Sequence, residues 1–256
     1  METVYGVCNL AVVPVRAQPS DRSEMTTQLL FGDCFQVIEQ TDKWAYIQHA
    51  YDDYTGWIDR KQFVTVNLHE YMQWKTCESV TGLFREQHLQ TVKGRLQLVP
   101  GCTLPYDDFK LGEQSYSYSR ELVLPSTELF AEKIEEYSAF YLNSPYLWGG
   151  RSPFGIDCSG FTQVIFKLLG IRVKRDASQQ AEQGETVDFL SAARTGDLAF
   201  FDNDEGRIVH VGIMLGNSAI IHASGRVRID AIDNQGIYND ELNRHTHKLR
   251  IIKRFC

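Results

Sequence analysis

The chain has 256 residues, of which 43% are hydrophobic and 23% charged, so it is long enough for two or three globular domains. Asp and Glu number 33 against 26 Lys and Arg, which gives a net charge of −7. This balance argues against a nucleic-acid-binding protein, because such a protein needs a basic face to neutralise phosphates. No apolar run reaches the roughly 18 residues of a membrane span, so we expect no membrane-spanning segment.

The six cysteines form no Cys-x-x-Cys pair and are too sparse for a disulfide-stapled scaffold. We expect most of them to be small buried side chains, and we expect no metal and no other cofactor. The start of the chain, METVYGVCNLAVVPV, has no basic region and no small-residue cleavage site typical of a signal peptide. This predicts a cytoplasmic protein if Met1 is native, and a periplasmic or exported one if a signal peptide has been removed.

Residues 1–65 are predicted to form short strands. LLFGDCFQVIEQ, KWAYIQHA and GWIDRKQFV are rich in aromatic and β-branched residues and are separated by turn signals. A small all-β barrel is the natural solution for this pattern. Residues 66–124 repeat it less clearly in MQWKTCESVTG, TVKGRLQLVPGCTLPYDDF and SYSYSRELVLP, which predicts a second small β domain.

Residues 125–256 change the pattern and are predicted to form an α+β domain. Ser126 or Thr127 can cap a helix over 128–142, which Asn143-Ser144-Pro145 ends. FTQVIFKLLG predicts a second helix that ends at Gly170. After residue 195 the segments DLAFF, RIVHVGIML, AIIHAS and KLRIIKRF alternate like strands, which favours a helix packed on an antiparallel sheet.

Cys158 is the best candidate nucleophile, because it falls in the first turn of the second predicted helix. The unpaired N–H groups and the positive end of the macrodipole favour a thiolate there. A neighbouring imidazolium would lower the thiol pKa further from its usual value of about 8.5. The alternative for a lone cysteine is a buried structural side chain.

His210 and His222 lie on two consecutive predicted strands joined by Leu215-Gly216-Asn217-Ser218. A loop with an odd number of residues centred on Gly216 would place them directly opposite each other on one face. A two-residue Gly216-Asn217 turn would place them on opposite faces. The shared-face register would let His210 act as a base while His222 orients it, whereas either histidine alone is more typical of an ordinary surface residue.

The motifs DCSGF, RTGDLAFF and HVGIMLGNSAIIHAS together resemble the NlpC-type family of bacterial cysteine peptidases, which has a papain-like fold. The match covers roughly residues 128–256. VRAQPS, EMTTQLLFGD, KWAYIQH and YTGWI resemble a bacterial SH3-like domain, and residues 66–124 fit a second, divergent one. The whole layout resembles the γ-D-glutamyl-L-diamino acid endopeptidases, or dipeptidyl-peptidases VI, which cut murein peptides. The resemblance therefore implies two SH3-like barrels followed by a papain-like catalytic domain.

The resemblance implies a role for each residue of the reaction centre. Cys158 would be the nucleophile, His210 the general base and acid, and His222 the orienting residue. Tyr146 and the backbone N–H of Cys158 would stabilise the oxyanion. Ordinary aromatic packing is the alternative for Tyr146.

The resemblance also implies substrate contacts. Trp148, Asp157 and Ser159 would line the substrate site, although Trp148 could instead pack and Asp157 could cap the helix. Ser178, in KRDASQQ, would touch the γ-D-Glu carboxylate. Glu24 and Tyr54, with Tyr51 as the alternative, would bind a free N-terminal amine, although Glu24 could equally be a solvated loop charge and Tyr54 could pack on Trp57.

Two other classes of function remain open from the sequence. One is a non-catalytic wall-binding protein built on SH3-like domains, and the other is a zinc protein with Cys158, His210 and His222 as ligands. A general peptidoglycan hydrolase, an amidase or an acyl transferase could use the same three residues. We expect a monomer whose partners are murein peptides, and the sequence leaves open whether the diamino acid is lysine or meso-diaminopimelate.

Overall fold

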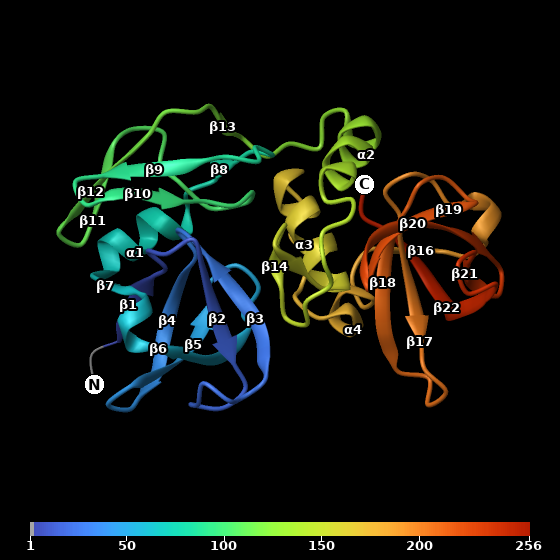
Figure 1. Ribbon diagram of the computed structural model, residues 1–256, viewed down its shortest axis with the longest axis horizontal. Coiled ribbons are helices and arrows are strands. Elements are labelled where there is room, and N and C mark those ends of the chain that lie inside the picture. The colour runs from blue at the N-terminus through green and yellow to red at the C-terminus, as the bar shows by residue number, and fades with distance from the viewer. Residues whose placement is uncertain (1–2) are drawn as a thin grey trace. The chain divides into compact units, whose positions relative to one another are not determined.

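The computed structural model describes residues 3–256 and divides into two compact units, one ending at Pro125 and one spanning Ser126–Cys256 (Figure 1). None of the helices within residues 3–256 has the length and hydropathy of a membrane span.

The first part of the N-terminal unit is a seven-stranded antiparallel sheet. Its strands follow the order β3-β2-β6-β5-β4-β1-β7. They are β1 (Val4–Val7), β2 (Val12–Arg16), β3 (Met25–Leu30), β4 (Cys34–Gln40), β5 (Trp44–His49), β6 (Thr55–Asp59) and β7 (Val64–Val66), with the 3-10 helix η1 (Arg60–Gln62) before β7. Burial alternates along β2 and β5, as expected for strands with one face on a core. That core contains Val13, Val15, Leu29, Phe35, Ala45, Ile47 and Ile58.

A helix opens the second part of this unit, where the sequence predicted only strands. Helix α1 (Leu68–Lys75) begins at a capping box in which Asn67 accepts from the N–H of Glu70 and Glu70 accepts from the N–H of Asn67. The strands that follow form a four-stranded sheet, β10-β9-β12-β11, and a two-stranded sheet, β13-β8. They are β8 (Val80–Thr81), β9 (His88–Thr91), β10 (Gly94–Gln97), β11 (Phe109–Leu111), β12 (Gln114–Tyr118) and β13 (Leu122–Val123).

The two parts of the N-terminal unit share a core. One cluster of buried side chains joins Leu30 and Phe31 of the first part to Leu89, Val99 and Leu104 of the second. The backbones also meet closely, because a Cβ at Gly32 would lie 2.0 Å from the carbonyl oxygen of Thr103. The prediction of two separate SH3-like barrels is therefore not confirmed, and residues 66–124 pack with the first sheet in one unit.

The C-terminal unit is a seven-stranded antiparallel sheet with helices α2 (Phe130–Phe140), α3 (Cys158–Leu168) and α4 (Ala177–Gln180). The strand order is β16-β22-β17-β18-β19-β20-β21. These strands are β16 (Glu185–Val187), β17 (Leu198–Asp202), β18 (Ile208–Met214), β19 (Ala219–Ser224), β20 (Arg226–Asp233), β21 (Gly236–Asn239) and β22 (Arg244–Arg254), and β14 (Arg151–Ser152) pairs with β15 (Gly155–Ile156). The 3-10 helix η2 (Leu190–Ala192) follows β16.

Helix α2 begins later than the sequence predicted. Its N-cap is Leu129, in the left-handed conformation with φ of 57°, and no side chain caps the helix. The Ser126 hydroxyl instead accepts from the N–H of Glu128, so it stabilises the turn that precedes the helix.

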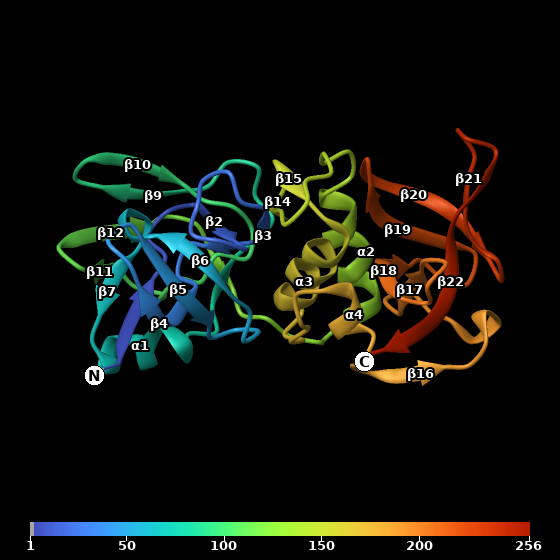
Figure 2. The same cartoon turned by 90° about the horizontal axis from the view of Figure 1, so that it is seen from below.

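Helix α3 is central to the C-terminal unit, and all of its residues are buried. It packs on β18 and β19, and both views show it alongside β18 (Figures 1 and 2). Gly170 has a φ of 77°, which confirms it as the residue that ends this helix. The helix thus holds its first residue, Cys158, against the sheet.

Candidate active site

The Cys158 thiol lies where strands β18 and β19 separate. The ladder between these strands begins at the Gly212–His222 pair, so Val211 has no partner residue on β19 in that register. The N–H groups of Val211 and Ser159 lie close enough to the sulfur of Cys158 to lower its pKa. The sulfur is therefore near the backbone of the residue that follows His210.

His210 and His222 share one face, which agrees with one of the two alternatives that the sequence left open. The pairs Gly212–His222 and Met214–Ile220 centre the loop on Asn217 rather than Gly216. The two histidines are therefore diagonal neighbours and not directly opposite. Nε2 of His210 lies 2.8 Å from Nδ1 of His222, so the rings are hydrogen bonded to each other.

Gly212 makes room for this contact, because it is the residue opposite His222. A Cβ at this position would lie 2.8 Å from the Cβ of His222 and 2.7 Å from Cδ1 of Ile220. Real side chains do not approach this closely, so only glycine leaves the His222 ring free to lean toward His210.

Two further residues complete the surroundings of the histidines, and the sequence did not single them out. Asp230 on β20 has its Oδ2 3.0 Å from Nε2 of His222. His247 on β22 stacks on His210 with ring centroids 4.2 Å apart. Pairing of β20 with β19 and the position of β22 determine both contacts, so only a correct sheet topology could have revealed them.

Burial changes the protonation expected at Cys158. It raises the pKa of the thiol to about 12, and the charge of Asp157 adds to this, while the N–H of Val211, the Arg175 guanidinium and the N–H of Ser159 oppose it. Burial also lowers the pKa of His210 well below its usual value, and His222 and His247 lower it further. Both effects favour a neutral thiol and a neutral imidazole. The thiolate favoured by the helix N-terminus is thus outweighed by desolvation.

Asp157 is the N-cap of α3, as one of the two sequence readings predicted. Its carboxylate accepts from the N–H groups of Gly149 at 2.8 Å and Gly160 at 2.6 Å. Arg175, which is 1% exposed, donates to both carboxylate oxygens at 3.1 and 2.6 Å. The Ser159 hydroxyl also donates to this carboxylate at 3.4 Å, so five contacts use the roughly four acceptor positions of the carboxylate. Arg175 also donates to the Ser159 hydroxyl at 2.8 Å, a partner that the sequence did not predict.

Tyr146 and Trp148 lie in the segment before the β14–β15 pair. Tyr146 is half-buried and interacts electrostatically with Cys158, which places the two side chains near each other. Burial raises the pKa of Tyr146 to about 12, with Cys158 and Asp157 adding to the effect, so its hydroxyl stays a hydrogen-bond donor. The Trp148 side chain is 58% exposed, so it is available to a substrate.

Ser178 lies in the short helix α4 and is exposed. Gln180 of the same helix is buried and joins α4 to α3, because its side chain contacts the hydroxyl of Thr162 and the carbonyl of Ser159. Ser178 is therefore held on an element that is hydrogen bonded to Ser159, the residue after Cys158.

Glu24 and Tyr54 belong to the N-terminal unit. Glu24 is exposed just before β3, and its carbonyl accepts from the N–H of Ala17. Tyr54 is partly buried at the end of the β5–β6 loop, where its N–H donates to Asp52. Trp57 packs on Tyr46, with ring centroids 5.2 Å apart.

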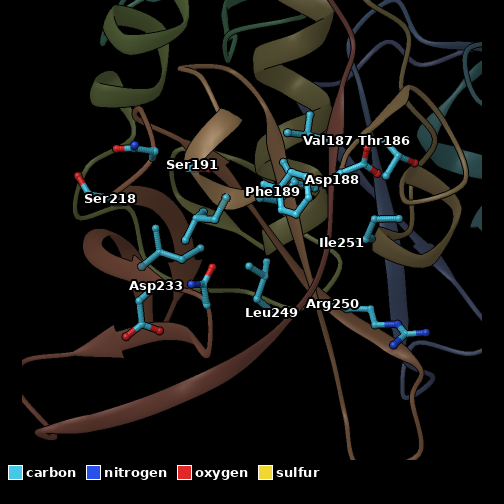
Figure 3. A pocket seen from close by; sticks show the side chains of 15 residues that line it. Thr186, Val187, Asp188, Phe189, Ser191, Ser218, Asp233, Leu249, Arg250 and Ile251 are labelled. Carbon is cyan, nitrogen blue, oxygen red and sulfur yellow. The ribbon is translucent and has the colours of Figure 1, made fainter.

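A groove of about 800 Å³ lies elsewhere in the C-terminal unit, between the β16–η2 segment and β22. Figure 3 shows Phe189, Asp233 and Arg250 among its lining residues. Cys158 and His210 do not line it, so the groove is separate from the candidate active site.

Within residues 3–256 no group of three or more His, Cys, Asp or Glu side chains is arranged to hold a metal ion. The zinc reading also conflicts with the geometry of the histidines. Nε2 of His210 and Nδ1 of His222 face each other at 2.8 Å, so both nitrogens are used by one hydrogen bond.

The sequence profile of the NlpC/P60 family matches residues 143–246, and that of the bacterial dipeptidyl-peptidase Sh3 domain matches residues 15–63. Gamma-D-glutamyl-L-lysine dipeptidyl-peptidase of Bacillus subtilis (strain 168) is 32% identical over 212 residues, which are 77% of this chain and 71% of that protein. The chain belongs to the NlpC/P60 family. This NlpC/P60 protein is thus a hydrolase of a cysteine peptidase family, and the chain also carries an SH3-like domain.

Other relatives of this NlpC/P60 protein extend the match over almost the whole chain. Dipeptidyl-peptidase 6 of Lysinibacillus sphaericus is 28% identical over 257 residues, which are 88% of this chain and 91% of that protein. Among solved structures, an NlpC/P60 family protein from Bacillus cereus ATCC 10987 has a TM-score of 0.79 at 20% identity and covers 98% of this chain and 99% of its own. At that identity the structure supports the fold.

Proposed function

We propose that this NlpC/P60 protein is a cysteine peptidase that hydrolyses the γ-D-glutamyl–L-diamino acid bond of murein peptides with a free N-terminal L-Ala. The observation that carries the proposal is the position of the Cys158 sulfur near the N–H of Val211, the residue after His210, which is itself hydrogen bonded to His222. The bond is suggested by the name of the Bacillus subtilis relative, gamma-D-glutamyl-L-lysine dipeptidyl-peptidase.

The reaction begins with the neutral thiol–imidazole pair. His210 uses Nε2 for His222, which leaves Nδ1 as the nitrogen that takes the proton of Cys158. The sulfur attacks the γ-carbonyl carbon of D-Glu, and His210 then gives its proton to the departing amine of the diamino acid. Water, activated by the same nitrogen, hydrolyses the thioester and releases L-Ala-D-Glu.

Negative charge develops on the carbonyl oxygen during each attack. The backbone N–H of Cys158 is at the start of α3, where it has no partner within the helix. The Tyr146 hydroxyl is the second donor in this proposal, and its pKa of about 12 keeps it protonated. Two such donors typically contribute a large share of transition-state stabilisation.

Selection for a free amine is assigned to Glu24 and Tyr54, as the family resemblance implies. An ammonium group needs a carboxylate and further acceptors that are partly desolvated. The Asp157 carboxylate is already used by Gly149, Gly160 and Arg175, so its part in binding is to hold the start of α3. Trp148, Ser159 and Ser178 complete the proposed substrate contacts.

The test compares L-Ala-γ-D-Glu-L-Lys, the meso-diaminopimelate tripeptide, the N-acetylated tripeptides and intact sacculi. N-acetylation should lower kcat/KM at least about a hundredfold, equivalent to about 2.7 kcal/mol of transition-state binding. Glu24→Gln should lose activity on the free tripeptide, whereas Glu39→Gln, an exposed change on the same sheet, should retain it.

Cys158→Ala should abolish turnover while the matched change Cys77→Ala does not. Activity of Cys158→Ala within about tenfold of the unmodified protein would contradict a thiol peptidase. Equal cleavage of acetylated peptides or sacculi would instead indicate a general peptidoglycan hydrolase.

A further inference from the structure

We propose that Asp230 is a positioning residue that fixes the tautomers of His222 and His210 and thereby prepares His210 to accept the Cys158 proton. The catalytic consequence rests on the peptidase mechanism proposed above. The hydrogen-bonded arrangement itself can be tested without a substrate.

The contacts form one chain through the sheet. His222 is 1% exposed, and both of its ring nitrogens are used. Nδ1 lies 2.8 Å from Nε2 of His210, and Nε2 lies 3.0 Å from Oδ2 of Asp230. On the adjacent strands Ile220 is the pairing partner of Asp230, so Asp230 and His222 are diagonal neighbours on one face.

The carboxylate decides which nitrogen of each ring carries hydrogen. An ionised carboxylate only accepts, so Nε2 of neutral His222 must hold the hydrogen. Nδ1 of His222 then has a lone pair and accepts from Nε2–H of His210. A neutral His210 with hydrogen on Nε2 has its lone pair on Nδ1, which is the form that can take a thiol proton.

Asp230 is kept ionised by Arg228, which is in turn bound by Glu241. Arg228 reaches both of its oxygens at 2.9 Å, and Glu241 in turn binds Arg228 at 3.0 Å and Arg226 at 2.9 Å. Burial alone would raise the pKa of Asp230, but hydrogen bonds from His222 and Arg228 outweigh it, and the pKa is lowered. The carboxylate therefore remains charged across the neutral range.

His247 is another titratable group that faces the pair of histidines. It stacks on His210 and has its ring centroid 5.6 Å from that of His222. Burial and His222 lower its pKa to about 4, with Asp230 opposing, so it is neutral above that pH. At neutral pH it therefore adds no positive charge next to His210 and His222.

Replacing Asp230 by Asn should reverse the tautomers. Arg228 can only donate, so the amide oxygen turns toward the guanidinium and the NH₂ group toward His222. Nε2 of His222 would then accept, its Nδ1 would carry the hydrogen, and His210 would hold its own hydrogen on Nδ1. The same loss of the working tautomer occurs when the buried aspartate of a serine protease triad becomes asparagine.

The first experiment compares Asp230→Asn with Asp233→Asn. Asp233 is the matched control, because it lies on the same strand and its carboxylate lies 3.0 Å from a nitrogen of a different histidine, His245. In ¹⁵N-histidine-labelled protein, Asp230→Asn should move the hydrogen of His222 from Nε2 to Nδ1. It should also lower kcat and the rate of Cys158 alkylation by about tenfold or more, with KM within about twofold.

An unchanged His222 spectrum in Asp230→Asn, or alkylation at the rate of Asp233→Asn, would overturn the proposal. Alkylation and the spectrum need no murein peptide, so an inactive parent protein would count against the proposed substrate and not against this role of Asp230. Peptide mass spectrometry separates Cys158 from the exposed Cys256.

A second pair of variants tests the role of Asp230 if Asp230→Asn does not fold. Arg228→Gln removes the donor to Asp230, whereas Arg226→Gln removes only a donor to Glu241. In ¹⁵N-histidine-labelled Arg228→Gln, Asp230 should be protonated at a higher pH than in the parent, so the hydrogen of His222 should leave Nε2 at a higher pH, and Arg226→Gln should not show this shift. Identical pH profiles for these two variants would refute the assignment.

Discussion

Gly212→Ala tests whether the contact between the two histidines depends on the absence of one methyl group. The new Cβ would lie 2.8 Å from the Cβ of His222, whereas carbon atoms prefer about 3.5–4.0 Å. His222 or its strand must therefore move by about 1 Å. Such a movement along the contact would lengthen the 2.8 Å separation from His210 beyond the range of a hydrogen bond.

The expected cost has two parts. Overpacking of this kind lowers the free energy of unfolding by about 1–3 kcal/mol. Misplacement of a catalytic group by about 1 Å can lower kcat/KM about a hundredfold. Because the loss of stability and the loss of kcat/KM have different causes, a control variant should show the first without the second.

Gly216→Ala is that control, because Gly216 lies in the loop between the same strands. Its φ of +86° strains any side chain, but a Cβ there meets nothing within 4 Å. It should cost about 1–2 kcal/mol of stability and leave kcat/KM nearly unchanged. Urea unfolding and steady-state kinetics measure both quantities. A Gly212→Ala enzyme within about threefold of the parent kcat/KM would refute the reasoning.

Three further predictions follow from the protonation states. Because burial raises the pKa of Cys158 and lowers that of His210, alkylation of Cys158 should accelerate as pH rises past 8.5, and a rate that is already maximal at pH 6 would show a resting ion pair instead. Tyr146→Phe should lower kcat/KM by about a hundredfold without changing alkylation, and a smaller loss than about threefold would exclude the hydroxyl from the oxyanion site. Burial alone would lower the pKa of His49, but Asp52 and Asp33 raise it to about 9. The protonated His49 should therefore contribute about 3 kcal/mol to stability, fully below pH 6.5, and this contribution should be lost as pH rises through 9. Urea unfolding of the parent and of His49→Gln at pH 6 and pH 10 should show the loss only in the parent, and parallel profiles would contradict it.

The parts of the site that the sequence could predict are those set by local pattern. A cysteine in the first turn of a helix, with Asp157 as its cap, follows from helix periodicity and capping. The shared face of His210 and His222 was left as one of two registers, because Gly216-Asn217 suits either loop length. The observed register differs from both predicted ones, because the loop is centred on Asn217 and not on Gly216 or on a two-residue Gly216-Asn217 turn.

The parts that the sequence could not predict depend on long-range pairing or on burial. Arg175 reaches Asp157 across 18 residues, and Asp230 reaches His222 only because β20 lies beside β19. Helix α1 was missed because its cap, Asn67 with Glu70, precedes the segment whose composition favoured strands. The sequence could not weigh burial against the thiolate expected at Cys158, because the helix N-terminus is a local effect, whereas desolvation comes from the whole domain.

The shared core of the N-terminal unit bears on how such a unit can pass between proteins. The SH3-like match ends at residue 63, yet Leu30 and Phe31 are buried with Leu89, Val99 and Leu104, which come after it. A recombination event that moved only residues 15–63 would transfer a sheet with an uncovered apolar surface. We expect the exchangeable block to extend to Pro125, so shuffling of these enzymes should preserve the strands after α1 even where their sequences diverge.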